Sequence, residues 1–392
     1  MSHETQSPFA YVAALGMLIV ALFVLTNTSP SPAVIPETIP ESAQTASVAP
    51  ANIAPSPTPT ANKEGTEPAP SKEPAPQKAA LPAASSNEEK KASSVVRIQD
   101  PYPFPPQSFL TVNESTRAAL VNILCTTEGD VLLPTSGSGV IIDPRGVILT
   151  NAHVAQYVLL AESERVNLSC TIRSGAPAHA LWIAKVLYIP SIWVQEHAAD
   201  ITTTDPTGTG EHDYALLVIT GPLDPSAPKL NSLPFLPIDT REAIGFPHDS
   251  VLAASYPAEF VGPAATQLNL HPASSITSVR ELLTFGEDTV DLLSLGGVAE
   301  AQSGSSGGPV VNAWGRLIGI ITTTSEGATT ADRELRALTL SYIDRDITAQ
   351  TGLNLSAILG TDVHALVENF TRLQAAGLAD LLIGEIAKRQ QR

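Results

Sequence analysis

The chain has 392 residues and a formal net charge of −17, from 39 acidic and 22 basic side chains. Nucleic-acid binding requires a basic surface, so this balance argues against a protein that binds DNA or RNA. The length leaves room for more than one domain.

The first distinctive segment covers residues 9–26, which contain no charged side chain. This length is close to the shortest helix that spans a bilayer. Lys63 is the first lysine or arginine of the chain, so flanking positive charges give no orientation. We expect an uncleaved transmembrane anchor that follows a short tail, residues 1–8. A cleavable signal peptide is the alternative, with residues 31–33 as a poor cleavage site.

Residues 27–107 form a low-complexity segment that contains about half of the 33 prolines of the chain. Alanine, serine, threonine and glutamate fill most of the remaining positions. Such a segment buries too little apolar surface to offset the entropy lost on ordering. We therefore predict a disordered linker that is partly polyproline II.

Residues 108–350 contain a series of short apolar or alternating runs that are separated by turn residues. This pattern predicts an all-β domain built from barrels or sandwiches. The expected strands are 118–125, 138–142, 147–150, 166–172, 181–188, 214–219, 250–255, 275–279, 290–294, 308–312, 317–324 and 337–342.

His153 directly follows one of these apolar strands and is a candidate general base. A carboxylate is needed to orient such a histidine. Asp213 stands at the head of the apolar run 214–219, whereas the residues after Asp200 are rich in threonine. We favour Asp213 for this role and keep Asp200 as the alternative.

Ser306 lies within the segment Gly304-Ser305-Ser306-Gly307-Gly308-Pro309 and is a candidate nucleophile. Gly304 can adopt backbone angles closed to other residues, so the N–H groups of Gly304 and Ser306 can point into one oxyanion hole. Gly307 and Gly308 are expected to leave space for a substrate carbonyl. An ordinary turn between strands is the non-catalytic alternative.

The segments Thr150–His153 and Gly304–Pro309, in this order, resemble the trypsin/chymotrypsin superfamily of serine peptidases. The segment 137–146 is most similar to the bacterial Deg-type branch. This resemblance covers roughly 111–350 and implies two six-stranded Greek-key β-barrels, with His153 and Asp213 in the first and Ser306 in the second. It also implies peptide-bond hydrolysis that needs no metal or other cofactor.

The chain departs from the family in two places. Ser305 occupies the position at which digestive proteases carry the aspartate that pairs with a newly cut N-terminus, so we expect no such zymogen switch. Deg-type proteins usually carry a peptide-binding PDZ domain after the protease, but only about 42 residues follow position 350 here. The chain therefore resembles a Deg-type peptidase without that domain.

The same resemblance places Glu300 at the base of the pocket for the side chain that precedes the cut, with Thr322, Thr323 and Thr324 as one wall. A carboxylate there would favour arginine or lysine. The threonines narrow the pocket, and Deg-type enzymes usually prefer small aliphatic residues. The alternative is that Glu300 faces solvent.

Two further features lie outside these motifs. Cys125 and Cys170 both fall in expected strands and are not spaced as metal ligands, so we predict a disulfide, with two buried thiols as the alternative. Residues 351–392 carry apolar residues at helical spacing, with a loosening expected at 375–377. This helical tail either packs on the barrel or mediates self-association.

These observations predict a membrane-anchored serine endopeptidase that acts on protein or peptide substrates. The domain would lie on the extracytoplasmic side, in a bacterial cell envelope. A catalytically inactive protease fold that serves as a binding module is one alternative, and an esterase with the same triad is another. The oligomeric state does not follow from the sequence.

Overall fold

The computed structural model covers the whole chain, and the expected anchor and residues 27–89 of the expected linker lie outside its described part. No helix within the described residues is long and apolar enough to cross a membrane. The structure describes residues 90–92, 95–127, 132–203, 208–230, 232–242, 244–259, 262–286, 288–324 and 333–391.

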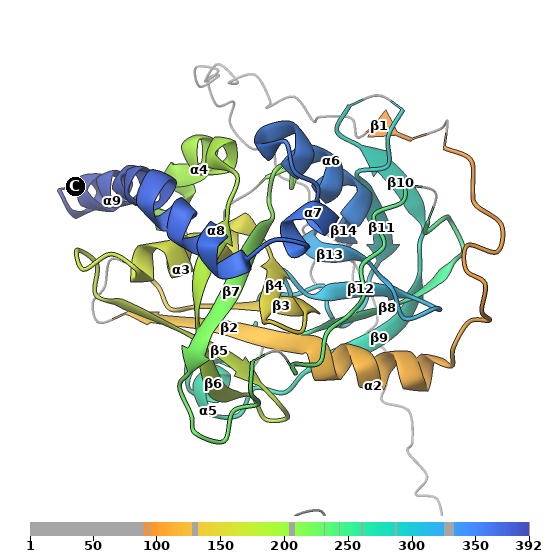
Figure 1. Cartoon of the computed structure of the whole chain (residues 1–392), viewed down its shortest axis with the longest axis horizontal. Helices are drawn as coiled ribbons and strands as arrows, with labels where there is room; N and C mark the ends of the chain where they lie inside the picture. The colour runs from red at the N-terminus through yellow and green to blue at the C-terminus, as the bar shows by residue number, and fades with distance from the viewer. Residues whose placement is uncertain are drawn as a thin grey trace, which may run out of the picture. The chain divides into compact units, whose positions relative to one another are not determined.

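The first six strands after residue 107 form a closed antiparallel barrel, which confirms this part of the predicted fold (Figure 1). β4 is buried along its whole length and β7 over residues 215–219, because both faces of these strands are covered. Ile148 and Leu217 belong to one hydrophobic core cluster. Leu149 and Leu216, on the opposite face, belong to another cluster, which also contains residues of the second sheet. In spatial order the strands are β2 (Leu120–Thr127), β3 (Thr135–Asp143), β4 (Val147–Thr150), β7 (Ala215–Pro222), β6 (His179–Tyr188) and β5 (Leu168–Ser174).

The second sheet has eight strands, so the prediction of a second six-stranded barrel requires correction. β9 and β10 stand at different places in the sheet, yet only Val279 and Arg280 separate them in the chain. The Val279 N–H donates to the Asp249 carbonyl next to β8, and the Arg280 N–H donates to the Ser294 carbonyl of β11. One bent segment, residues 273–284, therefore forms β9 at one edge of the sheet and β10 near the other edge. β1 pairs with β10 and is an additional edge strand. In spatial order the strands are β1 (Lys90–Lys91), β10 (Glu281–Thr284), β11 (Leu292–Gly296), β14 (Leu335–Thr339), β13 (Leu317–Thr324), β12 (Pro309–Asn312), β8 (Ser250–Ser255) and β9 (Ala273–Ser278).

The last part of the expected linker packs against this second sheet. β1 pairs with β10, and the Tyr102 hydroxyl donates to Asp239. The Tyr102 ring lies 5.3 Å from that of Trp314, whose indole N–H donates to the Phe104 carbonyl. Aromatic rings supply the apolar area that the rest of the proline-rich segment lacks. The expectation of a disordered linker up to residue 107 is therefore wrong for these residues.

The helices begin and end at residues that the sequence marks clearly. In α6 the Thr339 hydroxyl accepts from the Tyr342 N–H at 3.1 Å, and Gly352, with φ of 76°, follows the last turn. The helices are α2 (Phe109–Ala119), α3 (Ala152–Ala161), α4 (Ser191–His197), η1 (Ala198–Thr202), α5 (Gly262–Leu268), α6 (Leu340–Thr351), α7 (Leu355–Leu359), α8 (Val363–Phe370), η2 (Thr371–Ala375) and α9 (Ala376–Gln390).

The helical tail packs on the first barrel (Figure 1). Phe370 of α8 and Leu378, Leu382 and Ile386 of α9 join the same core cluster as Leu159 of α3. The loosening expected at 375–377 lies earlier in the chain, in the π-helical turn η2, whereas Ala376 and Gly377 are in α9. Packing on the barrel therefore uses the apolar face that the sequence indicated.

Candidate active site

The pairing of β4 with β7 brings His153 and Asp213 together. His153 is the second residue of α3, directly after β4, and Asp213 stands two residues before Ala215, which opposes Thr150. The His153 ring Nδ1 lies 2.8 Å from Asp213 Oδ2, and the His153 backbone N–H donates to Asp213 Oδ1 at 3.0 Å. One carboxylate thus fixes both the backbone and the ring of the histidine.

Asp213 is 5 % exposed and is surrounded by donors. The Thr322 hydroxyl donates to Asp213 Oδ2 at 2.9 Å. Burial acts to raise the pKa of Asp213, but the His153 charge and these hydrogen bonds outweigh it and lower that pKa. Burial likewise acts to lower the pKa of His153, and the Asp213 charge and hydrogen bond outweigh it and raise that pKa above 6.5. The pair therefore stabilises an imidazolium next to an ionised carboxylate.

Asp200, the alternative carboxylate, has a different partner. It lies in η1, and its Oδ2 is 2.8 Å from Nδ1 of His197, whose ring stacks on Trp193. The structure gives Asp213, and not Asp200, the contact with His153.

The nucleophile turn is held in shape by three glycines. Gly304 has φ of 91° and Gly307 has φ of 84°, in the left-handed region that favours glycine. A Cβ on Gly307 would lie 2.1 Å from the Ser138 carbonyl oxygen, and one on Gly308 would lie 2.3 Å from that of Ala254. Close backbone packing therefore requires these two glycines, and their role in leaving space for a substrate carbonyl stays a prediction.

The half-buried Ser306 lies in a turn that is joined to Asp213 through β13. The Gly307 N–H donates to the Ile321 carbonyl at 2.8 Å, and the next residue, Thr322, donates to Asp213. Among the described residues, neither the Gly304 N–H nor the Ser306 N–H donates to another group of the chain, and no hydrogen bond joins the Ser306 hydroxyl to the His153 ring. Such contacts are often long before a substrate binds.

Residues 137–320 match the family model of the trypsin-like peptidase domain. This match supports the assignment of residues 137–320 to the trypsin/chymotrypsin-like superfamily of serine peptidases. No curated protein matches the chain.

In this peptidase domain Ser305 takes the place of the aspartate used by a zymogen switch. Ser305 is 1 % exposed, and its hydroxyl lies 2.9 Å from that of Ser255. The neutral hydroxyl groups of Ser255 and Ser305 thus pair at this position, where a buried aspartate would need a positively charged partner. The expectation that no new N-terminus is required stays a prediction.

Helix α6 holds the chain next to Asp213, a contribution that the motifs did not indicate. His212 has φ of 58°, its N–H donates to the Tyr342 hydroxyl at 3.0 Å, and its Nδ1 lies 2.9 Å from Asp346 Oδ2. The Asp346 hydrogen bond raises the pKa of His212. The signal in the sequence was the i, i+4 spacing of Tyr342 and Asp346, which places both on one face of a helix.

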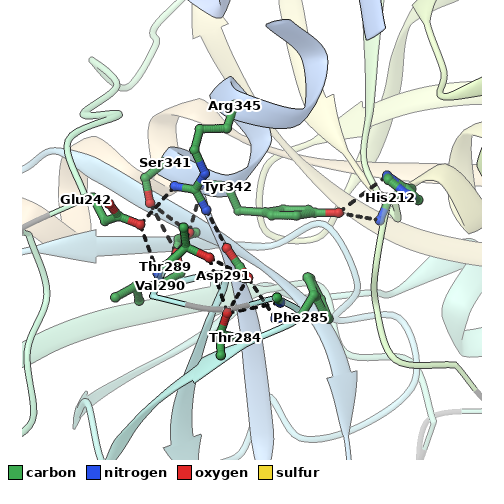
Figure 2. A network of polar contacts seen from close by, with 12 residues as sticks. His212, Glu242, Thr284, Phe285, Thr289, Val290, Asp291, Ser341, Tyr342 and Arg345 are labelled. Atoms are coloured by element: carbon green, nitrogen blue, oxygen red, sulfur yellow. Dashed lines mark hydrogen bonds and ion pairs between the residues drawn. The ribbon is translucent and has the colours of Figure 1, made fainter. Parts of the chain in front are cut away.

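The same helix is bound to the second sheet by a second polar cluster, as Figure 2 shows. Arg345 contacts Glu242 at 3.0 Å and also pairs with the buried Asp291. Asp291 in turn accepts from the Thr284 hydroxyl at 2.9 Å and the Phe285 N–H at 2.7 Å. Helix α6 therefore connects the second sheet to the residue that precedes Asp213.

Glu300 of the peptidase domain is fully buried, so the expectation that it could face solvent is wrong. Within the described part of the chain, neither of its carboxylate oxygens has a hydrogen-bond partner. Burial raises the pKa of Glu300, and the nearby Ser275 side chain, the Glu300 backbone and the Arg117 charge offset this only in part. The side chains of Thr323 and Thr324 lie outside the described residues, and Thr322 contacts Asp213.

Cys125 and Cys170 stand directly opposite each other on β2 and β5 and are joined by a disulfide. The alternative of two buried thiols does not describe this structure. Among the described residues, no group of three or more histidine, cysteine, aspartate or glutamate side chains could hold a metal ion.

Proposed function

We propose that this chain is a serine endopeptidase in which His153, Asp213 and Ser306 form the catalytic triad. The observation that supports it best is the Asp213 carboxylate, which binds both the ring and the backbone of His153 and is joined through Thr322 to the strand that holds the nucleophile turn. A trypsin-like peptidase domain is the expected setting for this arrangement.

In the proposed reaction, His153 accepts the proton of the Ser306 hydroxyl while the serine oxygen attacks a peptide carbonyl carbon. The Gly304 and Ser306 N–H groups stabilise the oxyanion of the tetrahedral intermediate. The imidazolium then gives its proton to the leaving amine, and the C–N bond breaks. A water molecule, deprotonated by His153, hydrolyses the acyl-enzyme and restores the serine.

We further propose that the enzyme is anchored in the membrane by residues 9–26, with its peptidase domain on the extracytoplasmic side. The uncharged segment and the disulfide support this location, since disulfides persist in oxidising compartments. An esterase would use the same residues. Turnover of casein compared with turnover of small esters distinguishes the two activities.

Labelling with a fluorophosphonate probe tests the proposal, because the probe reacts with an activated serine. We expect the wild type to label at Ser306, which peptide mapping by mass spectrometry distinguishes from Ser305. Ser306→Ala and His153→Ala should each abolish labelling and casein hydrolysis, since the triad acts as a unit. A folded wild type that does not label would support a catalytically inactive binding module instead.

A further inference from the structure

A buried serine of the first barrel contacts the nucleophile turn of the second sheet. Ser138 lies in β3 and is fully buried. Its N–H donates to the Ser306 carbonyl at 2.8 Å, and its hydroxyl donates to the Gly304 carbonyl at 2.7 Å. Ser138 therefore binds both residues whose N–H groups form the proposed oxyanion hole.

The orientation of the Ser138 hydroxyl is fixed by a third contact. The Tyr256 N–H donates to the Ser138 oxygen at 2.8 Å, and Tyr256 is 1 % exposed. Because a backbone N–H can only donate, the one hydroxyl hydrogen of Ser138 is left for Gly304. The Ser138 carbonyl in turn accepts from the Thr150 hydroxyl at 2.7 Å.

Gly304 needs such support because glycine is the least restricted residue of the backbone. The peptide that precedes it is held by the Ser303 carbonyl, which accepts from the Ala258 N–H at 2.8 Å. In a planar trans peptide the N–H points away from the carbonyl, so this bond directs the Gly304 N–H. The peptide that follows is held by the bond from Ser138. The two bonds together restrict rotation on both sides of Gly304.

We propose that Ser138 is a positioning residue that preorganises the oxyanion hole of Gly304 and Ser306. This inference rests on the proposed function. Without the hydroxyl, the Gly304 carbonyl and the Tyr256 N–H would both be buried without a partner, which is unfavourable. The peptide that follows Gly304 would then lose a restraint, and the N–H groups of Gly304 and Ser306 would be held less firmly toward the same oxyanion. The loss would affect the transition state and not the binding of a ligand.

The kinetics of fluorophosphonate labelling test this role, because the phosphonyl oxygen also occupies the oxyanion hole. We expect Ser138→Ala to lower the maximal labelling rate about 10- to 100-fold, while the concentration for half-maximal rate changes less than about twofold. Ser341→Ala is the matched control. It removes another buried serine hydroxyl, which lies 2.9 Å from the Thr339 hydroxyl, and should label at the wild-type rate.

Thermal unfolding of both variants separates positioning from general destabilisation. If Ser138→Ala does not fold, Ser138→Cys replaces it, since a thiol is a weaker donor of similar size, and its rate should fall between those expected for serine and alanine. A Ser138 variant that is folded and labels at the wild-type rate would overturn the positioning role alone. A wild type that does not label would overturn the proposed function and this role together.

Discussion

Asp213 is the residue whose surroundings most strongly constrain the proposed chemistry. Its carboxylate accepts from the His153 backbone, the His153 ring and the Thr322 hydroxyl. We expect Asp213→Asn to lower the rate of ester or peptide hydrolysis about 10⁴-fold, because an amide would favour the wrong histidine tautomer. Asp200→Asn is the control and should change the rate little. The assignment is wrong if Asp200→Asn is the damaging change.

The pH dependence of kcat/KM provides a separate prediction for the same pair. Neutral His153 is the active base, so activity is present above its pKa and is lost as the pH falls through it. Asp213 raises that pKa above 6.5, whereas burial acts to lower it. Asp213→Asn removes the negative charge that raises the pKa of His153. We therefore expect the acidic side of the pH profile of the residual kcat/KM to move to lower pH. An unchanged acidic side would show that another group controls it.

Glu300 is a buried carboxyl group that has no hydrogen-bond partner in the described part of the chain. A cation of the substrate would offset part of the cost of burying its charge. If Glu300 faces the substrate pocket, cleavage should favour arginine or lysine, and Glu300→Ala should remove this preference and leave probe labelling of Ser306 intact. Because burial raises the pKa of Glu300, the preference should grow as the pH rises through that pKa. A peptide-library profile dominated by alanine or valine, and unchanged in Glu300→Ala, would contradict this prediction.

The candidate catalytic residues could be predicted from the sequence, whereas the residues that hold them in position could not. His153 and Ser306 stand in recognisable local patterns, and Asp213 precedes an apolar strand. The contacts of Ser138 with Gly304 and of His212 with Tyr342 join residues more than a hundred positions apart. No local pattern encodes such contacts, because they depend on how the two sheets and α6 pack.

At the scale of secondary structure, the strands that bend or lie at an edge were the hardest to predict. β10 was missed because it continues β9 after two residues, so it has no turn of its own. β1 was missed because its two lysines lie in a segment with the composition of a disordered chain. The expected strand 337–342 includes the start of α6, whose first residue is Leu340.

The pairing of β2 with β5 includes the disulfide between Cys125 and Cys170, which are 45 positions apart. Closing a loop of this length restricts the unfolded chain and contributes about 4 kcal/mol in the chain-entropy model. We expect Cys125→Ser with Cys170→Ser to lower the free energy of unfolding by up to about this amount, as measured by urea denaturation. Two unpaired thiols in protein exported by its native host would contradict the prediction.

The packing of α9 on the first barrel makes a prediction with an internal control. Leu382 is fully buried in the core cluster, whereas its neighbour Leu381 is 44 % exposed. Leu382→Ala should lower the free energy of unfolding by about 2–5 kcal/mol, and Leu381→Ala should change it by less than about 0.5 kcal/mol. If the tail instead mediates self-association, Leu381→Ala would change the sedimentation velocity of the protein.

For the whole molecule, the main question is how the peptidase domain relates to the membrane. The uncharged segment 9–26 leads us to expect that the full-length protein fractionates with membranes. Because residues 95–107 contact the second sheet, the soluble form should be cut before Lys90 and not at Ser108. A chain that begins at Ser108 lacks the Tyr102 contacts with Asp239 and Trp314, so it should unfold at a lower temperature than one that begins at Lys90.

In intact cells, added protease should release the domain by cutting between residues 27 and 89. Protection of the chain from that protease would place the domain in the cytoplasm and would also contradict the disulfide prediction, since cytoplasmic thiols are kept reduced.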